Sequence, residues 1–235
     1  MSLVYCPGIE VGKITRLSVD ESHHLTRVLR KSEGKKLHLC DGKGNLYSGN
    51  IASVIKKQAY VQVVSVLKSL KSPESKLHIA IAPTKNISRF EWFVEKATEI
   101  GIAGIIPIHT KHSERDKINI LRLEKIIISA MKQSGHLFKP ELHPLTDFTD
   151  VIQLKTECRF IGYSETLPQD HLIAMANSNT PTLMLIGPEG DFTKDEYRKA
   201  SGSGFYPVKL GNSRLRTETA GVVAAQIFNS KGFIE

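Results

Sequence analysis

From residue 77 onward the chain alternates strand-like apolar segments with amphipathic helical segments, and this rhythm restricts the fold more than any other feature. The apolar runs at 159–163 and 182–187 are continuous, which is typical of a parallel sheet covered on both faces. Other strands are expected at 77–83, 104–110 and 206–211, and helices at 88–100, 118–134, 193–200 and 219–228. Capping boxes are expected at the starts of two of these helices, Ser88 with Glu91 and Thr193 with Glu196. Such alternation predicts an α/β domain with helices on both sides of a mostly parallel sheet.

The first third of the chain has a different pattern, dominated by short strands. Residues 36–51 alternate apolar and polar side chains around Asp41-Gly42-Lys43-Gly44-Asn45, a strong hairpin signal, and 59–67 is rich in β-branched residues. A short helix is expected within 23–34, with Leu25, Val28 and Leu29 on one face and Gly34 after its end. Several short strands and one helix predict a small barrel.

A polar segment with Pro73 separates the two patterns. We therefore expect a barrel in residues 1–69, a linker in 70–76 and an α/β domain in 77–235. Residues 1–69 hold 11 Lys and Arg against 5 Asp and Glu, or +6 of the total net charge of +8. A concentrated positive charge favours polyanions such as nucleic acid, and a lysine-rich surface kept for solubility is the equal alternative.

The cysteines and the apolar runs exclude several classes of protein. Cys6, Cys40 and Cys158 are scattered and lack CxxC spacing, which fits a reducing cytoplasm and indicates neither a disulfide framework nor a zinc site. Adjacent His23 and His24 point apart on a helix, so we expect them to face solvent or RNA and expect no metal. The sequence shows no secretory signal and no apolar run long enough to span a membrane.

Two loops carry the strongest functional signal. Gly187-Pro188-Glu189-Gly190 follows one predicted strand, and 210–221, LGNSRLRTETAG, follows another. Ligands bind beyond the carboxyl ends of strands in open α/β sheets, and glycine lets a backbone approach a ligand closely. We expect a side chain added at Gly187 or Gly211 to occupy ligand space. No GxGxxG or GxxxxGK[ST] motif is present, and an acidic loop favours a neutral or cationic ligand over a phosphate.

GPEGDFTKDE (residues 187–196) followed by LGNSRLRTETA resembles the paired motif of the RsmE-type methyltransferases of the SPOUT superfamily. HHLTRVLRKSEGKKLHLCDGKG resembles the PUA-like RNA-binding barrel of this family, and FEWFVEKATEIGIAGIIPIHTKHSE resembles the beginning of its catalytic domain. The sequence departs from the family pattern at Asp191, where many relatives have glycine, and at His136, where relatives often have arginine.

The resemblance implies methylation of N3 of a uridine in small-subunit ribosomal RNA, free or in the assembled subunit, with S-adenosylmethionine (SAM) as donor. It also implies a C-terminal trefoil knot, a homodimer with the active site at its interface, and a cytoplasmic enzyme. RNA affinity is expected from Arg27, Arg30 and Lys31. The expected donor-binding residues are Leu185, Ile186, Gly187, Pro188, Glu189, Gly190, Leu210, Gly211, Asn212, Leu215, Arg216, Thr219 and Ala220.

Methylation at N3 requires loss of the imide proton and stabilisation of the developing uracil anion. Arg216 is the candidate stabiliser, and Glu218 or Glu189 is expected to orient it or accept the proton. An alternative is that Arg216 and Glu218 form a structural ion pair. Two other functions remain open: a SPOUT enzyme that methylates a ribose 2′-hydroxyl, and a non-catalytic RNA-binding protein.

Overall fold

The computed structural model describes residues 3–73, 75–163 and 171–231. The chain divides into two compact units, each of which is described by itself. Unit 1 comprises Met1–Pro73 and Met131–Lys139, and unit 2 comprises Glu74–Ala130 and Pro140–Glu235. Within the described ranges, none of the helices is both long and apolar enough to cross a membrane.

Unit 1 contains a five-stranded sheet in the order β1-β3-β4-β5-β2. The turn between β3 and β4 is the predicted hairpin, with φ of 74° at Gly42 and 97° at Gly44. The Asp41 carboxylate accepts hydrogen bonds from the backbone N–H groups of Lys43, at 2.8 Å, and Asn45, at 3.2 Å, which holds the turn closed. The strands are β1 (Leu3–Tyr5), β2 (Ile14–Arg16), β3 (Lys36–Cys40), β4 (Asn45–Ile55) and β5 (Gln58–Ser69).

The helix predicted within 23–34 begins earlier in the structure than the sequence pattern indicated. The structure has α1 (Val19–His23) followed by a π-helical turn, η1 (His24–Val28). The helix starts earlier because the Ser18 hydroxyl caps it by accepting from the N–H of Glu21, at 3.2 Å. It ends before Arg30, whose φ of 49° is incompatible with a right-handed helix.

Unit 2 contains a six-strand path in the order β12-β10-β11-β6-β7-β8, with β9 paired to β7, and every pairing is parallel. The predicted continuous strands are confirmed: all five residues of β11 are buried. The strands are β6 (Leu77–Ile81), β7 (Gly104–His109), β8 (Glu141–Leu142), β9 (Thr146–Asp147), β10 (Cys158–Gly162), β11 (Thr182–Ile186) and β12 (Tyr206–Val208).

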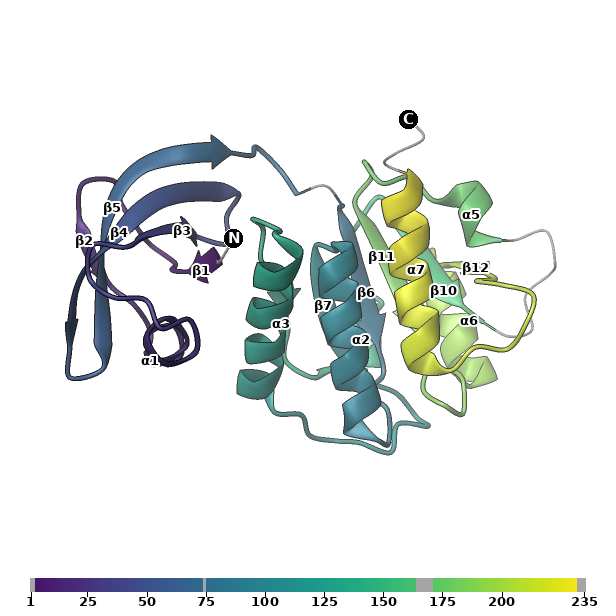
Figure 1. Ribbon diagram of the computed structural model, residues 1–235. Coiled ribbons are helices and arrows are strands. Elements are labelled where there is room, and N and C mark those ends of the chain that lie inside the picture. Colours follow the sequence, from purple (N-terminus) through teal and green to yellow (C-terminus); the bar gives the residue numbers. More distant parts are fainter. Residues whose placement is uncertain (1–2, 74, 164–170, 232–235) are drawn as a thin grey trace. The chain divides into compact units, whose positions relative to one another are not determined.

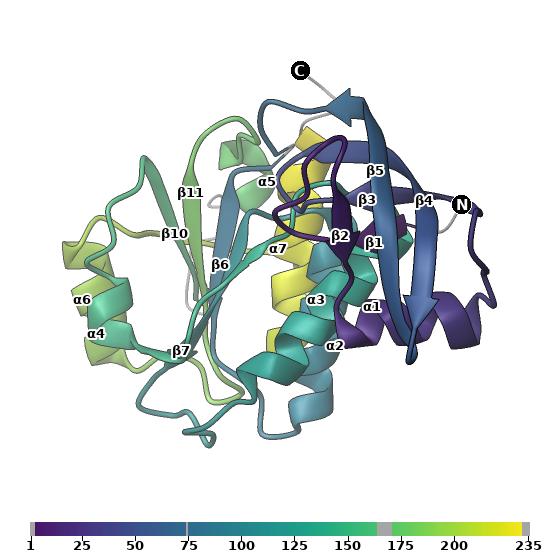
Figure 2. The same cartoon turned by 90° about the vertical axis from the view of Figure 1, so that its left-hand side faces the viewer.

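Helices cover both faces of this sheet, as expected (Figures 1 and 2). Figure 2 shows α2 (Ile87–Ile100), α3 (Ile120–Ser134) and α7 (Thr217–Lys231) on one side and α4 (Phe148–Val151) and α6 (Lys194–Gly202) on the other. A short helix, α5 (Leu172–Met175), follows β10. Two buried clusters match these layers, with Phe90, Phe93 and Phe228 on the α2–α7 side and Phe148 and Phe192 on the α4–α6 side.

One of the two predicted capping boxes is present in the structure, and the other is not. The Thr193–Glu196 capping box at the start of α6 is confirmed. The box predicted from Ser88 and Glu91 is wrong, because α2 begins two residues earlier, with the Asn86 side chain accepting from the N–H of Ser88, at 3.1 Å. Glu91 instead pairs with Arg122 of α3. Both helices nevertheless place the loops before them at the carboxyl edge of the sheet.

Candidate functional site

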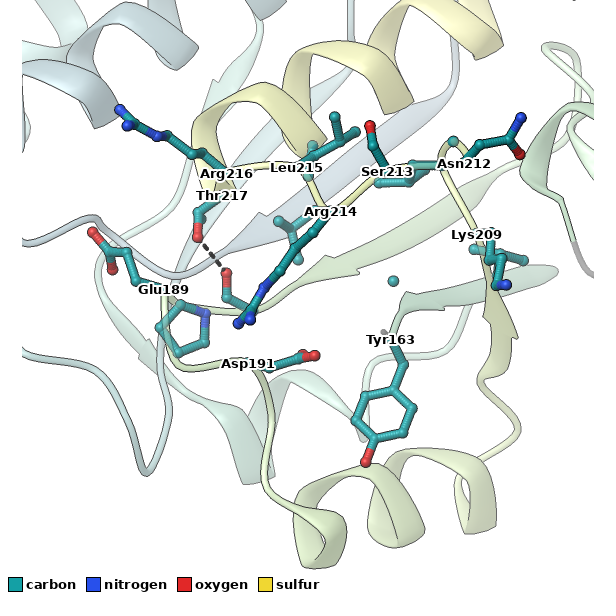
Figure 3. A pocket seen from close by; sticks show the side chains of 18 residues that line it. Tyr163, Glu189, Asp191, Lys209, Asn212, Ser213, Arg214, Leu215, Arg216 and Thr217 are labelled. Atoms are coloured by element: carbon teal, nitrogen blue, oxygen red, sulfur yellow. Dashed lines mark hydrogen bonds between the residues drawn. The ribbon is translucent and has the colours of Figure 1, made fainter. Parts of the chain in front are cut away.

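A cavity of about 470 Å³ lies beyond the carboxyl ends of β10, β11 and β12 (Figure 3). These three strands are neighbours and run parallel, so the loops that follow them leave from the same edge. The size is within the usual range of small-molecule sites, about 300–1,000 Å³. The parallel sheet therefore brings together loops that are distant in the sequence.

Most of the residues expected to bind a ligand line this cavity. Ten of them do so: Ile186, Gly187, Pro188, Glu189, Leu210, Gly211, Asn212, Leu215, Arg216 and Ala220. Four other site candidates do not line it. Leu185 is fully buried in β11, and Gly190, Glu218 and Thr219 lie next to lining residues. The backbone segments were thus predicted better than the individual side chains.

One hydrogen bond joins the two loops. The Thr217 hydroxyl at the start of α7 donates to the carbonyl oxygen of Gly187, at 3.0 Å, and Figure 3 shows this bond spanning the loops. Thr217 is buried and the bond as a whole is partly buried, so water has only limited access to it. The position of the first loop relative to the second therefore depends in part on a single hydroxyl group.

The first loop is also held by segments that follow β6 and β7. Glu189 accepts a hydrogen bond from the backbone N–H of Lys85, at 3.0 Å. The pKa of the Lys85 ammonium is raised by its 2.7 Å contact with the Glu114 carboxylate. His112 Nδ1 lies 3.0 Å from the carbonyl oxygen of Asp191 and is placed to donate to it. These contacts order the loop before any ligand binds.

The two glycines that were expected to border the ligand differ. A Cβ built on Gly211 would meet no atom within 4 Å, so this backbone borders open space. A Cβ on Gly187 would lie 3.2 Å from the ring and the backbone nitrogen of Phe192, which is buried. The expectation that a side chain at Gly187 would occupy ligand space is therefore wrong, because it would press on the core instead.

Asp191 also lines the cavity and has a φ of 60°. The left-handed region favours glycine, and aspartate is among the few other residues that adopt it readily. Its carboxylate accepts from the N–H of Phe192, at 2.8 Å, which supports this local conformation. The aspartate therefore adds a negative charge to the cavity wall at a position with a backbone geometry suited to glycine.

The list of expected donor-binding residues did not include several residues that line the cavity. Gly162 is the last residue of β10 and Tyr163 follows it, and both line the cavity. Because ligands bind beyond the carboxyl ends of parallel strands, the predicted strand at 159–163 could have indicated these two residues. Tyr163 stacks on Tyr197 of α6, with ring centroids 4.3 Å apart. The other lining residues that the prediction omitted are Val208, Lys209, Ser213, Arg214 and Thr217, together with Asp191.

Charges of both signs surround the cavity. Glu189 and Asp191 come from the first loop, and Lys209, Arg214 and Arg216 from the second. In Figure 3 the Arg214 side chain points toward the first loop, whereas Arg216 points the other way. The acidic side suits a cation, and the basic side suits an anionic substrate such as RNA.

Glu218, in the first turn of α7, is buried and lies outside the cavity. Arg89 forms an ion pair with it, with Nε 3.9 Å from Oε1, and Oε2 has no hydrogen-bond partner among the described residues. No ion pair joins Arg216 to Glu218 in the described part of the chain. A carboxylate at a helix N-terminus interacts favourably with the helix dipole, which is consistent with a structural role.

The three basic residues expected to bind RNA lie in or just after η1 of unit 1. Arg27 and Arg30 are exposed, and Lys31 is half-buried. Exposed guanidinium groups are available for phosphate contacts.

All the residues that line the cavity lie in the part of the chain that resembles known RNA methyltransferases. A family model described as an RNA methyltransferase domain matches residues 71–229, and one described as an RNA methyltransferase PUA domain matches residues 17–64. The ribosomal RNA small subunit methyltransferase E of Rickettsia conorii is 28% identical over 218 residues, which cover 92% of this chain and 88% of the relative. That of Bacillus subtilis is 26% identical over 231 residues, covering 92% and 90%.

Two solved structures are similar over almost the whole length. A probable rRNA methyltransferase from Porphyromonas gingivalis has a TM-score of 0.90 and 39% identity, and the match covers 100% of this chain and 99% of the other. A putative methyltransferase from Legionella pneumophila, solved in complex with the bound cofactor SAM, has a TM-score of 0.85 and 31% identity, with coverage of 97% and 96%.

Proposed function

We propose that this chain, which belongs to the RsmE-type family of RNA methyltransferases, transfers a methyl group from SAM to N3 of a uridine in small-subunit ribosomal RNA. The observation that carries the proposal is the cavity between the joined loops after β11 and β12. It lies within the matched RNA methyltransferase domain.

The cavity fits SAM in size and in charge. Open space next to Gly211 lets a ligand approach the backbone, as a bulky adenosyl group requires. When bound, SAM supplies an electrophilic methyl group on a sulfonium centre. Glu189 and Asp191 place negative charge on the wall of the cavity, which is favourable for a cationic ligand. The donor-binding residues are the lining residues of the two loops, with Leu185, Gly190 and Thr219 supporting them.

Arg216 is assigned the role of stabilising the uracil anion as the N3 proton leaves. A guanidinium presents two parallel N–H donors, which match a carbonyl oxygen that gains charge. Arg216 lines the cavity and forms no ion pair within the described residues, so it is available to a substrate. Its side chain must turn from the orientation in Figure 3 to meet the base.

Glu189 and Glu218, the two candidate carboxylates, are assigned different roles. Glu189 lines the cavity and is assigned as the proton acceptor at N3, with the Lys85 N–H orienting it. Glu218 does not reach the cavity and is assigned as a positioning residue that holds the first turn of α7, and with it Arg216 and Thr217. A general base must lie within hydrogen-bond reach of its proton, which favours Glu189.

RNA affinity is assigned to the basic N-terminal part, a PUA-like barrel of residues 1–69. The match of residues 17–64 to an RNA methyltransferase PUA domain and the net charge of +6 support this. Arg27, Arg30 and Lys31 are the proposed phosphate contacts. The proposed domain organisation also includes a linker at residues 70–76 and a SPOUT domain at residues 77–235.

The remaining features of the proposal follow from the family. They are a trefoil knot in the C-terminal region, a homodimer with the active site at its interface, and a location in the cytoplasm. The similarity to structures of the same family over nearly the full length supports them.

The test is transfer of tritium from methyl-labelled SAM to small-subunit particles that lack the modification, together with calorimetry of SAM binding. Gly211→Val projects a side chain into the open cavity, so we expect a folded protein that neither binds SAM nor transfers label. Gly202→Val is the matched control, because its Cβ also meets nothing within 4 Å but lies in α6, outside the cavity. Unchanged SAM affinity in Gly211→Val would contradict the site assignment.

A further inference from the structure

Two histidines and a glutamate meet at the edge of the sheet opposite the cavity. His78 is the second residue of β6, Glu141 begins β8, and His143 follows β8. The Oε2 atom of Glu141 lies 3.9 Å from Nε2 of His78 and 3.6 Å from Nε2 of His143. One ligand atom from each residue lies within 4.8 Å of the other two.

The strand register explains why these side chains converge. His78 and Glu141 both pair with Gly104 of β7, one from each side, so all three positions face the same side of the sheet. A Cβ on Gly104 would lie only 2.5 Å from Cδ2 of His78. The glycine therefore leaves room for the imidazole to lie across β7 toward Glu141.

His143 is held on the same face by an extension of the β8 pairing. Its backbone N–H donates to the carbonyl oxygen of Ile105, at 3.0 Å. It lies two residues after Glu141, and side chains two apart along an extended strand point to the same side. The cluster is thus built from the backbone ladder of three adjacent strands.

We propose that His78, Glu141 and His143 bind a divalent transition-metal ion, zinc in the first instance. Ligands at about 2.1 Å from a tetrahedral zinc ion lie roughly 3.4 Å apart. The 3.9 Å and 3.6 Å separations of Glu141 from the two imidazoles exceed that spacing by about 0.5 Å and 0.2 Å. The two imidazole nitrogens lie within 4.8 Å of each other, so they need to approach by at most about 1.4 Å. Two imidazoles and one carboxylate favour zinc, nickel or cobalt over magnesium and calcium, which prefer oxygen ligands only.

The exposure of the cluster leaves room for an ion and a fourth ligand. The side chain of Glu141 is 72% exposed, that of His143 41% and that of His78 34%. Water can complete the coordination. The sequence predicted no metal, because these residues are scattered along the chain and converge only through strand pairing, and the proposal replaces that expectation.

A bound ion would link β6 to β8 across β7 and brace this edge of the sheet. The site does not depend on the proposed methyl transfer, because the SAM cavity lies beyond the carboxyl ends of β10, β11 and β12, whereas the cluster lies at the amino ends of β6 and β7 in the same parallel sheet. An ion that binds the folded chain and not the unfolded chain raises the melting temperature. This stabilisation is the consequence to measure.

The experiment is a calorimetric titration of zinc chloride into the full chain without a histidine tag, followed by melting with and without zinc. We expect one zinc site in the wild type and a zinc-dependent rise in melting temperature. His78→Ala, His143→Ala and Glu141→Gln should each weaken zinc binding by at least about tenfold, the scale of losing even an outer-shell partner. Circular dichroism and SAM affinity, both expected to be unchanged, show that the variants are folded.

His109→Ala is the matched control. Its side chain is as exposed as that of His143, at 41%, and its Nδ1 lies 3.8 Å from a single carboxylate, that of Asp147. This variant should bind zinc like the wild type. Gly104→Ala is a second test that removes no ligand, since its Cβ displaces the His78 ring and should weaken zinc binding. Absence of zinc binding in the wild type, or a zinc affinity in the three ligand variants equal to that of the wild type, overturns the proposal.

Discussion

Replacing Thr217 with valine removes the hydroxyl that joins the two loops while keeping the shape of the side chain. The Gly187 carbonyl then loses its 3.0 Å partner in a partly buried place. Leaving a buried acceptor unsatisfied costs about 1–3 kcal/mol, and partial access of water favours the lower half of that range. For a chain of this size each kcal/mol lowers the melting temperature by about 2–4 °C, so we expect a fall of roughly 2–8 °C.

The same change should weaken SAM binding, because the loops no longer have a common position before the ligand arrives. If the free energy of SAM binding becomes less favourable by about 1.4 kcal/mol, the affinity for SAM falls about tenfold. Isothermal calorimetry with SAM, and melting followed by circular dichroism, measure the two effects on the same samples.

Thr217→Ser is the matched control, because it keeps the donor to Gly187 and loses only a methyl group. That methyl is worth about 0.8 kcal/mol of stability when buried, so the serine variant should melt slightly earlier and yet bind SAM nearly as the wild type does. Equal SAM affinity in the valine and serine variants would refute the role given to this hydrogen bond.

Two other predictions concern charge and thiol chemistry. Arg216→Lys should lower the single-turnover rate of methyl transfer by about two to three powers of ten, the scale of losing one oxyanion donor, and leave SAM affinity little changed. Arg214→Lys is the comparison, and a larger loss there than in Arg216→Lys would move the anion-stabilising role to Arg214. Burial raises the pKa of the Cys6 thiol to about 11 and that of Cys40 to about 12, with Glu21 adding to both shifts. Since the thiolate is the reactive form, iodoacetamide at pH 8 should label Cys158, which is partly exposed, well before these two, as peptide mass spectrometry would show. Equal labelling of all three thiols would contradict their burial.

The α/β architecture could be predicted because the signal is local and redundant. The residues of β11 are apolar on both faces, and amphipathic helices separate the strands, so few other folds satisfy the pattern. The short strands could not be predicted. β8 and β9 have two residues each and exist only because β7 pairs with them. The start of α1 was missed because it depends on one capping hydroxyl, that of Ser18.

The candidate site was predicted where it consists of contiguous loop backbone. Residues 186–189 and 210–212 line the cavity as expected, since strand ends and glycines mark them in the sequence. Tyr163 was missed because the rule for the carboxyl ends of parallel strands was applied only to the two strands with glycine-containing loops, and β10 was not recognised as the neighbour of β11. The His78 cluster was missed because strand register alone brings it together.

The central claim is tested most directly by the product of the reaction. Small-subunit particles that lack the modification are incubated with the protein and SAM, and the nucleosides of their RNA are separated and identified by mass spectrometry. We expect 3-methyluridine that depends on both SAM and the open space beside Gly211, with no increase in any ribose-methylated nucleoside. A 2′-O-methylated nucleoside in place of 3-methyluridine, or no methylated product from a protein that binds SAM, would contradict the central claim.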